Sequence, residues 1–467
     1  MSTNLYDQLE QYCSFGPYPF HMPGHKRRLA PNVQLPYGWD VTEVPGTDDL
    51  HEAMGILAQA MERTGKFWGS QKTWYLVNGS TCGLLAGIRA LAPQNARIIA
   101  ARNCHKAVFH AIELGNLSVR WIMPKVLPEG VCGPVDPEDL KKALEDCPDA
   151  ACVVLTSPTY EGILSDIQAC AALCHEKQIP LLVDEAHGAH LGLFPGWPES
   201  ALHAGADVVI QSVHKTLPSL TQTALLHLGQ DSLADPDEIE RQLAIFETSS
   251  PSYPLMVSID SCTDLLIRQG QWLFARWRQR LETFDREIQG LQHLQVLGHS
   301  RKREDFDPGK LPICTAGTNL RGRDLARILR DRYGMETEMS QGDICLAMTG
   351  LGDSDRAMHS LAEALLEIDS LVSTAERQAV LTIPHPGAEA CPVAQAVRKP
   401  CEEVYLENAQ DRISAEYVMA YPPGIPLILP GEVVSAEFVG VARELISSGT
   451  ELHHSRGGKK GIAVLKP

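Results

Sequence analysis

Asp184 and Lys215 each follow a short apolar run in the middle of the chain, the aspartate in PLLVDEAHGAH and the lysine in ADVVIQSVHKTLPSLTQ. If the two runs are neighbouring parallel strands, both side chains lie at the same edge of the sheet. A lysine that is partly desolvated there, without a salt bridge, is the kind of amine that forms Schiff bases with aldehydes. Taken one at a time, the two residues are also compatible with a surface lysine and a helix N-cap.

A third polar cluster, NGST at residues 78–81, follows the apolar run in YLVNGSTCGLLAGIRAL and precedes a helical pattern. Either Ser80 or Thr81 is a suitable N-cap for that helix. The same helix start also presents free N–H groups and the positive end of a helix dipole, which together bind phosphate. The cluster matches neither the GxxxxGK[ST] loop nor the GxGxxG fingerprint, so nucleotide binding is not indicated.

Together the three clusters predict a pyridoxal phosphate site. This cofactor needs a cradle for its phosphate, a carboxylate that keeps its pyridine nitrogen protonated, and a lysine that binds its aldehyde. Residues 78–81, Asp184 and Lys215 supply these groups in that order along the chain. His187 and His190 form an H-x-x-H pair without a Cys or carboxylate at a suitable spacing, so no metal site is expected.

The elements that position these residues are predicted from hydrophobic patterns. Residues 97–101, 152–156, 180–183 and 208–210 are expected to be buried strands, and the gaps between the last three have room for crossover helices. This alternation is typical of an α/β fold with a mostly parallel sheet covered by helices. Polar residues that follow its strands lie at the ligand-binding edge.

Outside the sheet, further helices and a second α/β unit are expected. A helical pattern begins at Leu50 and continues through Met54, and a long amphipathic helix spans Leu273 to Ile288. The segments LPICTA and DICLAM are predicted strands of the second unit, with helices near 323–333 and 354–368.

Composition narrows the class of function. The chain has 467 residues and a formal net charge of −17, which disfavours nucleic acid and membrane surfaces as partners and favours cationic small molecules. Its 13 cysteines are scattered without CxxC pairs, which indicates a reducing compartment and a cytoplasmic location. No signal peptide and no membrane span are expected, because no basic segment precedes an apolar one at the N-terminus and no run of about 18 apolar residues occurs.

Nine sequence blocks in register resemble the bacterial Orn/Lys/Arg decarboxylases, in the shorter form without an N-terminal wing domain. The resemblance implies decarboxylation of arginine, lysine or ornithine to the amine and carbon dioxide, with pyridoxal phosphate as cofactor, in polyamine biosynthesis. The blocks are PFHMPGHK, TEVPGTDDLH, NGST, RNCHKAV, TSPTYEG, VDEAHGAHLG, SVHKTLPSLTQ, ETSSPSY and YPPGIPLILPGE.

The resemblance also implies a domain organisation. The expected fold is the aspartate-aminotransferase-like fold (fold type I), with a smaller C-terminal α/β domain and a C-terminal extension. The expected boundaries are an N-terminal arm at 1–45, a cofactor-binding large domain at 46–300, a small domain at 301–370 and a C-terminal domain at 371–467.

Family roles carry over to matching residues. Lys215 would form the Schiff base and Asp184 would pair with the pyridine nitrogen, while His105 would lie over the ring face and His187 at its hydroxyl edge. Lys215 or His214 would return the proton after carbon dioxide leaves. The phosphate would be held by Ser80, Thr81, Ser212 and His214, and Ser249 or Ser250 would reach the phosphate of a neighbouring subunit, because family sites form at a homodimer interface.

The distal cation of a basic substrate needs a carboxylate partner. Glu43, Asp48, Asp49 and Glu432 are the candidates, against the competing interpretation of helix-start capping for the two aspartates and a solvated turn for Glu432. Another fold-type-I enzyme, an aminotransferase or a lyase, is an alternative, and Arg412 lies late in the chain where such aminotransferases bind the α-carboxylate. A catalytically silent paralogue is the third possibility.

Overall fold

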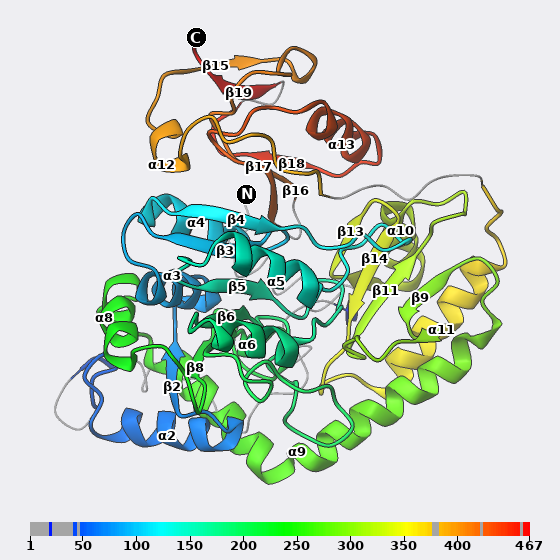
Figure 1. Cartoon of the computed structure of the whole chain (residues 1–467). Helices are drawn as coiled ribbons and strands as arrows, with labels where there is room; N and C mark the ends of the chain where they lie inside the picture. The colour runs from blue at the N-terminus through cyan, green and yellow to red at the C-terminus, as the bar shows by residue number, and fades with distance from the viewer. Residues whose placement is uncertain (1–17, 21–40, 44–46, 376–382, 421–423, 458–460) are drawn as a thin grey trace, which may run out of the picture.

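The computed structural model describes residues 18–20, 41–43, 47–375, 383–420, 424–457 and 461–467. Most of the predicted arm, including part of the PFHMPGHK block, lies outside the described residues. At the centre is a seven-stranded sheet in the order β2-β8-β7-β6-β5-β3-β4 (Figure 1). Strand β8 runs antiparallel to the other six, which all run in the same direction. The strands are β2 (Lys72–Leu76), β3 (Arg97–Ala101), β4 (Ser118–Ile122), β5 (Val153–Thr156), β6 (Leu181–Asp184), β7 (Val208–Gln211) and β8 (Ala224–Leu228).

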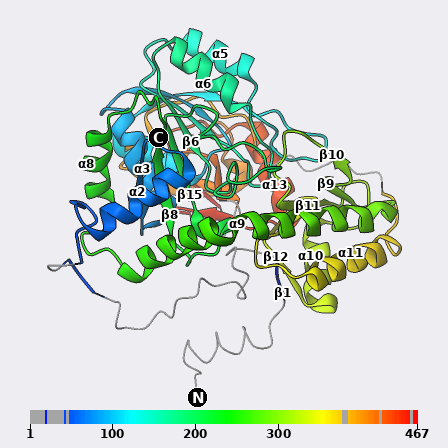
Figure 2. The same cartoon turned by 90° about the horizontal axis from the view of Figure 1, so that it is seen from below.

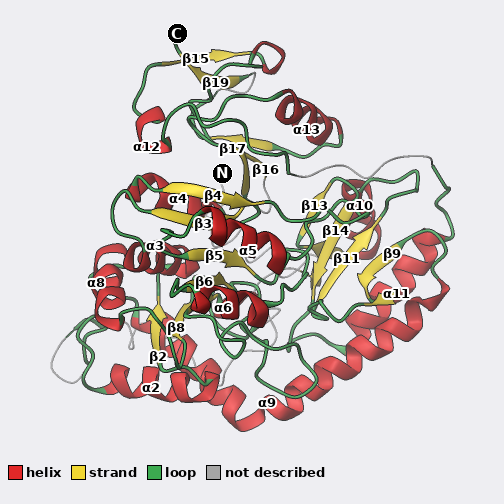
Figure 3. Cartoon of the chain, viewed as in Figure 1, coloured by secondary structure: helices red, strands yellow, loops and turns green. Residues whose placement is uncertain are grey.

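Helices cover both faces of this sheet (Figure 3). Alternate strand residues point to opposite faces, so Ile99 packs into one hydrophobic cluster and Ile98 into the other. The first cluster includes α2 (Ile56–Trp68), α5 (Pro137–Asp146), α6 (Ile167–Glu176) and α9 (Tyr253–Glu287), and the second includes α3 (Gly79–Leu91), α4 (Lys106–Gly115) and α8 (Pro236–Phe246). The predicted α/β class and mostly parallel sheet are confirmed.

Two local expectations were wrong. Helix α2 begins at Ile56 rather than near Leu50, because the Asp48 carboxylate accepts hydrogen bonds from Gly55 N and Leu57 N, at 2.8 and 2.9 Å, and fixes the helix start there. Met54 is consequently 90% exposed. Between β6 and β7 the chain runs through turns instead of a crossover helix, and this segment is interrupted by several prolines and glycines in AHGAHLGLFPGWP.

Helix α9 leads from the large sheet to a second, smaller sheet (Figure 2). That sheet has the order β10-β9-β11-β14-β13. Strands β11 and β14 correspond to the predicted LPICTA and DICLAM strands, and α10 and α11 to the two predicted helices. The elements are β9 (Gln295–Gly298), β10 (Arg301–Lys302), β11 (Lys310–Cys314), α10 (Gly322–Tyr333), β13 (Met339–Gln341), β14 (Ile344–Met348) and α11 (Asp355–Asp369); β1 (Tyr18–Phe20) pairs with β12 (Met335–Thr337) nearby.

The last part of the chain packs against α4 and β4 of the large sheet (Figure 1). Arg102, fully buried after β3, joins the two parts, because its guanidinium donates hydrogen bonds to the carbonyl oxygens of Pro426 and Leu427. The elements are α12 (Val393–Ala396), β15 (Cys401–Val404), β16 (Val418–Ala420), β17 (Ile425–Ile428), α13 (Ala436–Ser447), β18 (Leu452–His454) and β19 (Ile462–Leu465). Among the described residues, no helix combines the length and the apolar character that crossing a membrane requires.

Candidate active site

A cavity of about 510 Å³ lies at the carboxyl ends of the parallel strands β3, β5, β6 and β7. Residues 79–81, which follow β2, also line it. Two lining residues come from later parts of the chain: Glu338, between β12 and β13 of the small sheet, and Ile425, the first residue of β17. The cavity is therefore closed by all three parts of the fold, and its size is within the range of small-molecule sites.

Asp184 and Lys215 meet in this cavity, as the sequence predicted. Asp184 ends β6, pairs with Ile210 of the adjacent β7, and is 3% exposed. Lys215 lies on α7 (Val213–Thr216), a single helical turn that follows β7. Burial raises the pKa of the Asp184 carboxyl, and the nearby Lys215 lowers it. Burial lowers the pKa of the Lys215 amine, which Asp184 and Glu338 partly restore.

The start of α3 forms one wall of the cavity. The helix begins at Gly79 with Asn78 as N-cap, so Ser80 and Thr81 lie in its first turn instead of capping it. Ser80 Oγ is 2.6 Å from Ser212 Oγ, and this hydrogen bond ties the helix start to the end of β7. Gly83 lets α3 approach the sheet, since a Cβ at this position would lie 2.6 Å from Leu76 Cδ1.

Three histidines line the cavity around Lys215. His105 is the N-cap of α4, where its Nδ1 accepts a hydrogen bond from Ala107 N at 3.3 Å. Burial, with a smaller effect of Lys215, lowers the pKa of His105 to about 3, so its imidazole is neutral near pH 7. His187 Nε2 is 3.0 Å from Lys215 Nζ, and His214 Nδ1 donates to Thr223 O at 2.9 Å.

These residues fit pyridoxal phosphate. The cavity presents an amine, a buried carboxylate and a helix start with hydroxyl groups, which are the three features the cofactor needs. Two further lining residues of the described chain, Asn103 and Thr156, have buried side-chain oxygens, Oδ1 and Oγ1, that make no hydrogen bond within the protein. Such buried polar atoms are expected where a polar ligand completes the site.

The other predicted residues lie away from the cavity in this chain. The Glu432 carboxylate accepts a hydrogen bond from Leu429 N at 3.0 Å and lies 4.0 Å from Arg102 Nη2, so it is a buried ion-pair partner rather than a residue of a solvated turn. Asp48 fixes the start of α2, which was the competing interpretation of its role. Glu43, Asp49 and Ser250 likewise do not line the cavity, and the contacts predicted for them with substrate or with a second subunit stay predictions.

The sequence reasoning missed three residues around the cavity. Lys310 Nζ, from the start of β11, is 2.6 Å from His187 Nδ1. Glu338 accepts a hydrogen bond from the Tyr160 hydroxyl at 2.7 Å. Two of them had a signal in the sequence. Tyr160 lies in the TSPTYEG block, and Lys310 in DFDPGKLPICTA is adjacent to a predicted strand, as Asp184 is.

Arg412, the late arginine considered for an aminotransferase, also lies outside the cavity. Its Nη2 donates to Glu402 at 2.7 Å and to Leu465 O at 2.9 Å, within the C-terminal part of the chain. It is therefore not placed to bind the α-carboxylate of a substrate at Lys215.

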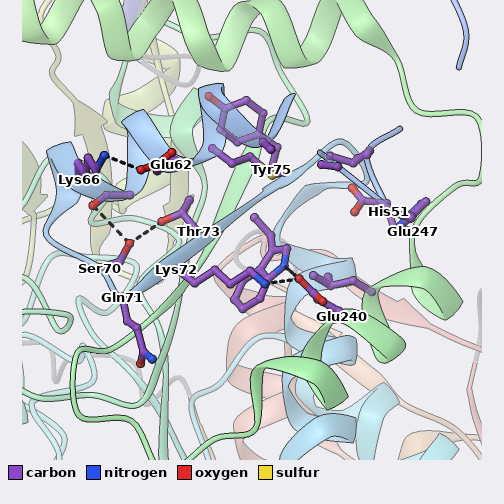
Figure 4. Close-up of a pocket in the computed structure, with 17 residues that line it drawn as sticks. His51, Glu62, Lys66, Ser70, Gln71, Lys72, Thr73, Tyr75, Glu240 and Glu247 are labelled. Carbon is purple, nitrogen blue, oxygen red and sulfur yellow. Dashed lines mark hydrogen bonds and ion pairs between the residues drawn. The ribbon is translucent and has the colours of Figure 1, made fainter. Parts of the chain in front are cut away.

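A second cavity, of about 400 Å³, lies at the free edge of the large sheet between α2, β2 and α8 (Figure 4). Two ion pairs lie in it, because Lys66 donates to Glu62 and Lys72 donates to Glu240. Glu240 also accepts from Trp74 Nε1, and Glu247 accepts from Val77 N. None of the predicted site residues lines it. Of these two cavities, the one that contains Lys215 is lined by predicted site residues and the second is not.

Two family models match separate stretches of the chain. The model described as Orn/Lys/Arg decarboxylase, major domain, matches residues 3–304, and the model described as Orn/Lys/Arg decarboxylase, C-terminal domain, matches residues 374–446. The chain is 35% identical over 481 residues to the uncharacterized protein YaaO of Bacillus subtilis (strain 168), covering 98% of this chain and 97% of that protein. It is 32% identical over 463 residues to the arginine decarboxylase of the same organism, covering 96% and 94% of the two chains.

Solved structures support the fold. The lysine decarboxylase LdcF of Francisella novicida superposes with a TM-score of 0.77 at 16% identity, over 99% of this chain and 83% of that one. The ureidoglycine-glyoxylate aminotransferase of Bacillus subtilis superposes with a TM-score of 0.55 at 12% identity, over 69% and 87% of the two chains. The predicted aspartate-aminotransferase-like fold is therefore confirmed.

Proposed function

The chain belongs to the Orn/Lys/Arg decarboxylase family, a family of pyridoxal-phosphate-dependent decarboxylases, and we propose from this premise that it removes the α-carboxylate of arginine. The observation that carries the proposal is the joint placement of Lys215, Asp184 and the start of α3 in one cavity. The choice of arginine is supported by arginine decarboxylases of Bacillus among the relatives, at 29–32% identity, against 22% for the lysine decarboxylases of Escherichia coli.

Bound pyridoxal phosphate supplies an electron-withdrawing ring that stabilises the carbanion left when carbon dioxide departs. Asp184 would hold the proton on the pyridine nitrogen, because a buried carboxylate is stabilised by a cation at hydrogen-bond distance. Lys215 would bind the aldehyde, and its lowered pKa increases the fraction of uncharged, nucleophilic amine. The remaining contacts that we assign are His105 over the ring face, His187 at the hydroxyl edge, and Ser80, Thr81, Ser212 and His214 at the phosphate.

Two residues are in position to return a proton to the α-carbon. Lys215 would hold and deliver this proton when its amine is free. His214 precedes it on α7 and also lines the cavity. We keep both as candidates, because each lines the cavity that contains Asp184.

The distal cation of the substrate would meet Glu338. Besides Asp184, this is the carboxylate among the described residues that line the cavity. Its hydrogen bond from Tyr160 orients the carboxylate, and a guanidinium that leaves water needs such a partner. We therefore place Glu338 ahead of Glu43, Asp48, Asp49 and Glu432 as the determinant of a cationic substrate.

The deciding experiment incubates the enzyme, reconstituted with pyridoxal phosphate, separately with arginine, lysine and ornithine. We expect carbon dioxide and agmatine from arginine at a kcat/KM at least about tenfold above the other two. Lys215→Ala should abolish both the products and the visible absorption of the bound cofactor. Release of a keto acid in place of an amine would refute decarboxylation and favour an aminotransferase, whereas cofactor binding without turnover would indicate a silent paralogue.

Glu338→Gln separates substrate recognition from catalysis. It keeps an acceptor for the Tyr160 hydroxyl but removes the charge, so kcat/KM for arginine should fall about 10- to 100-fold. Tyr160→Phe is the matched control, since it removes the orienting hydrogen bond and leaves the carboxylate in place, and it should have a smaller effect. An unchanged kcat/KM in Glu338→Gln would exclude this residue as the cation partner.

We further propose that the enzyme works as a cytoplasmic homodimer in polyamine biosynthesis. The twelve cysteines among the described residues all carry free thiols, which supports a reducing compartment. Sedimentation of the holoenzyme tests the dimer, and polyamine levels in a strain that lacks the protein test the pathway.

A further inference from the structure

Lys310 places a second amine against the active-site cavity. Its side chain, at the start of β11, is 1% exposed, and its Nζ lies 2.6 Å from His187 Nδ1 and 3.5 Å from Met348 Sδ. The stem passes Gly162, where a Cβ would lie 2.8 Å from Lys310 Cγ. Burying an amine is unfavourable unless hydrogen bonds and nearby charges compensate, so its alignment with His187 requires a physical explanation.

His187 stands between two lysines. Its Nε2 is 3.0 Å from Lys215 Nζ and its Nδ1 is 2.6 Å from Lys310 Nζ, so the imidazole links the two amines directly. Burial, followed by the effects of Lys215 and Lys310, holds the pKa of His187 well below its usual range. The imidazole is therefore neutral and carries one N–H donor and one lone pair.

This geometry restricts where the protons lie. The ring lone pair accepts a hydrogen bond from one lysine, and the ring N–H donates to the other, which must be uncharged to accept it. In one arrangement Lys310 is the ammonium that donates to Nδ1, and Nε2–H donates to uncharged Lys215. In the reverse arrangement Lys215 is charged and Lys310 is not.

The charges around the two amines favour the first arrangement when the cofactor lies in the cavity and Lys215 is still a free amine. Lys310 is influenced by three carboxylates, Asp307, Glu338 and Glu161, whereas Lys215 is influenced by Asp184 and Glu338. The proposed role of Asp184 at the pyridine nitrogen would occupy it with another cation. The proton then rests on Lys310, whose pKa is lowered by burial to about 8.

We propose that Lys310 is a positioning residue that, through His187, takes up the proton which Lys215 loses when its amine becomes a nucleophile. In this step the Lys215 ammonium gives a proton to His187 Nε2 while His187 Nδ1–H gives its proton to Lys310 Nζ. One proton enters and one leaves the imidazole, so the ring stays neutral and only its tautomer changes. The inference rests on the proposed function of Lys215, and it assigns to the small sheet a part in the chemistry.

Lys310→Met and Lys310→Arg test the proposal. Methionine keeps an unbranched stem without the charge, and arginine keeps the charge. Two quantities are measured for each variant. The first is the pKa of Lys215 in the full chain before cofactor is added, obtained from the pH dependence of its acetylation by mass spectrometry. The second is the pH midpoint of the visible absorption of the holoenzyme. Met348→Leu is the matched control, because it alters the other contact of Lys310 with little change in volume.

Removing the neighbouring cation should raise both values in Lys310→Met by about one pH unit, since a like charge at this range disfavours a second one. Met348→Leu should stay within about 0.3 unit of the unsubstituted protein. Lys310→Arg keeps the charge at every pH but cannot take up a proton, so it should leave both values low and serves as the control for the effect of the charge alone. The uptake itself is measured in the unsubstituted protein as the pH midpoint for acetylation of Lys310, which should be higher in the holoenzyme than before cofactor is added; an unchanged midpoint would contradict the proposed uptake. Unchanged values in Lys310→Met, or equal shifts in the methionine and arginine variants, would overturn the inference. The absence of any visible absorption in the unsubstituted protein would instead count against the proposed function.

A measurement on the unsubstituted holoenzyme covers the case in which Lys310→Met does not fold. In protein labelled with ¹⁵N-histidine, the signals of His187 are those lost in His187→Gln. We expect the chemical shifts of the Nε2–H tautomer near pH 7. The Nδ1–H tautomer, or a charged ring, would contradict the assigned direction of the hydrogen bonds.

Discussion

Arg102 offers the most direct test of how the C-terminal part of the chain supports the active site. Its guanidinium is fully buried, donates to the carbonyl oxygens of Pro426 and Leu427, and lies 4.0 Å from the Glu432 carboxylate. It also lies over the rings of Phe109 and Trp121, at 5.2 and 5.4 Å. Pro426 and Leu427 belong to β17, and Ile425 of that strand lines the cavity. The contacts of Arg102 therefore connect the packing of β17 with the site.

We expect Arg102→Met to destabilise the docked C-terminal part by about 3–5 kcal/mol, the usual cost of breaking a buried ion pair from one side. Two carbonyl oxygens lose their donor, at about 1–3 kcal/mol each. Glu432 is left buried without its cation; burial already raises its pKa, and Arg102 is what opposes that rise. Part of the penalty therefore disappears when Glu432 takes up a proton, which keeps the total below the sum of the separate contributions.

Hydrogen exchange followed by mass spectrometry measures this loss as the free energy of local opening of β16 and β17, without assuming that the whole chain unfolds in one step. Glu432→Gln should cost less than Arg102→Met, and the double variant should recover about 1–2 kcal/mol of the sum, because no buried charge remains unpaired. Cofactor affinity should fall in Arg102→Met. A loss below about 1 kcal/mol, or strict additivity of the two changes, would refute the reasoning.

Three further predictions follow from single side chains. Asp184→Asn should retain some cofactor but lower kcat at least about 100-fold, because a neutral amide does not hold the proton of the pyridine nitrogen; normal turnover would remove that role. Burial raises the pKa of Asp48, but hydrogen bonds from Met54 N and Gly55 N outweigh it and lower this pKa to about 2. Its stabilisation of α2 should therefore be complete above about pH 4 and lost as the pH falls towards 2. Asp48→Ala should cost about 1 kcal/mol in thermal unfolding at pH 7 but little at pH 2. Burial raises the pKa of Glu247 to about 7, against the hydrogen bond from Val77 N. The folded state therefore binds the extra proton between about pH 4.5 and 7, stability should decrease as the pH rises through that window, and Glu247→Gln should flatten this dependence in thermal unfolding curves.

The large sheet was predictable because its signals are local. Each parallel strand is a short apolar run, and the residue that follows it lies at the ligand-binding edge whatever the rest of the chain does. Asp184 and Lys215 could therefore be brought together from their positions alone, and the structure places them in one cavity. The start of α2 was misjudged for the opposite reason: Asp48 fixes it through backbone contacts seven and nine residues ahead, and the apolar periodicity does not reveal that contact.

Lys310, Glu338 and Ile425 could not be predicted from the same signals, because their positions depend on the packing of separate parts of the chain. Glu338 and Ile425 line the cavity, and Lys310 contacts His187, which lines it. Lys310 is the first residue of its strand, whereas Asp184 is the last residue of its own. Lys310 reaches His187 because β11 is antiparallel to its neighbours and α9 connects the small sheet to the large one. The positions of strand ends in the sequence do not predict how two sheets pack against each other. For Glu432 the sequence predicted too much. Its charge suggested a contact with substrate, but the carboxylate is the buried ion-pair partner of Arg102.

The cavity therefore combines groups with different structural origins. The proposed cofactor contacts follow strands of the large sheet or lie at the start of α3. The groups that we assign to substrate recognition and to proton storage, Glu338 and Lys310, come from the small sheet. Two electrostatic effects cross the boundary between the sheets: Glu338 raises the pKa of Lys215, and Lys215 lowers the pKa of Lys310. A change in the packing of the small sheet should thus alter substrate selection and the charge of Lys215 together, while leaving the phosphate contacts of α3 intact. Substitutions at the interface of β11 with the large sheet should accordingly change KM for arginine and the pH profile in parallel, with cofactor affinity changing least.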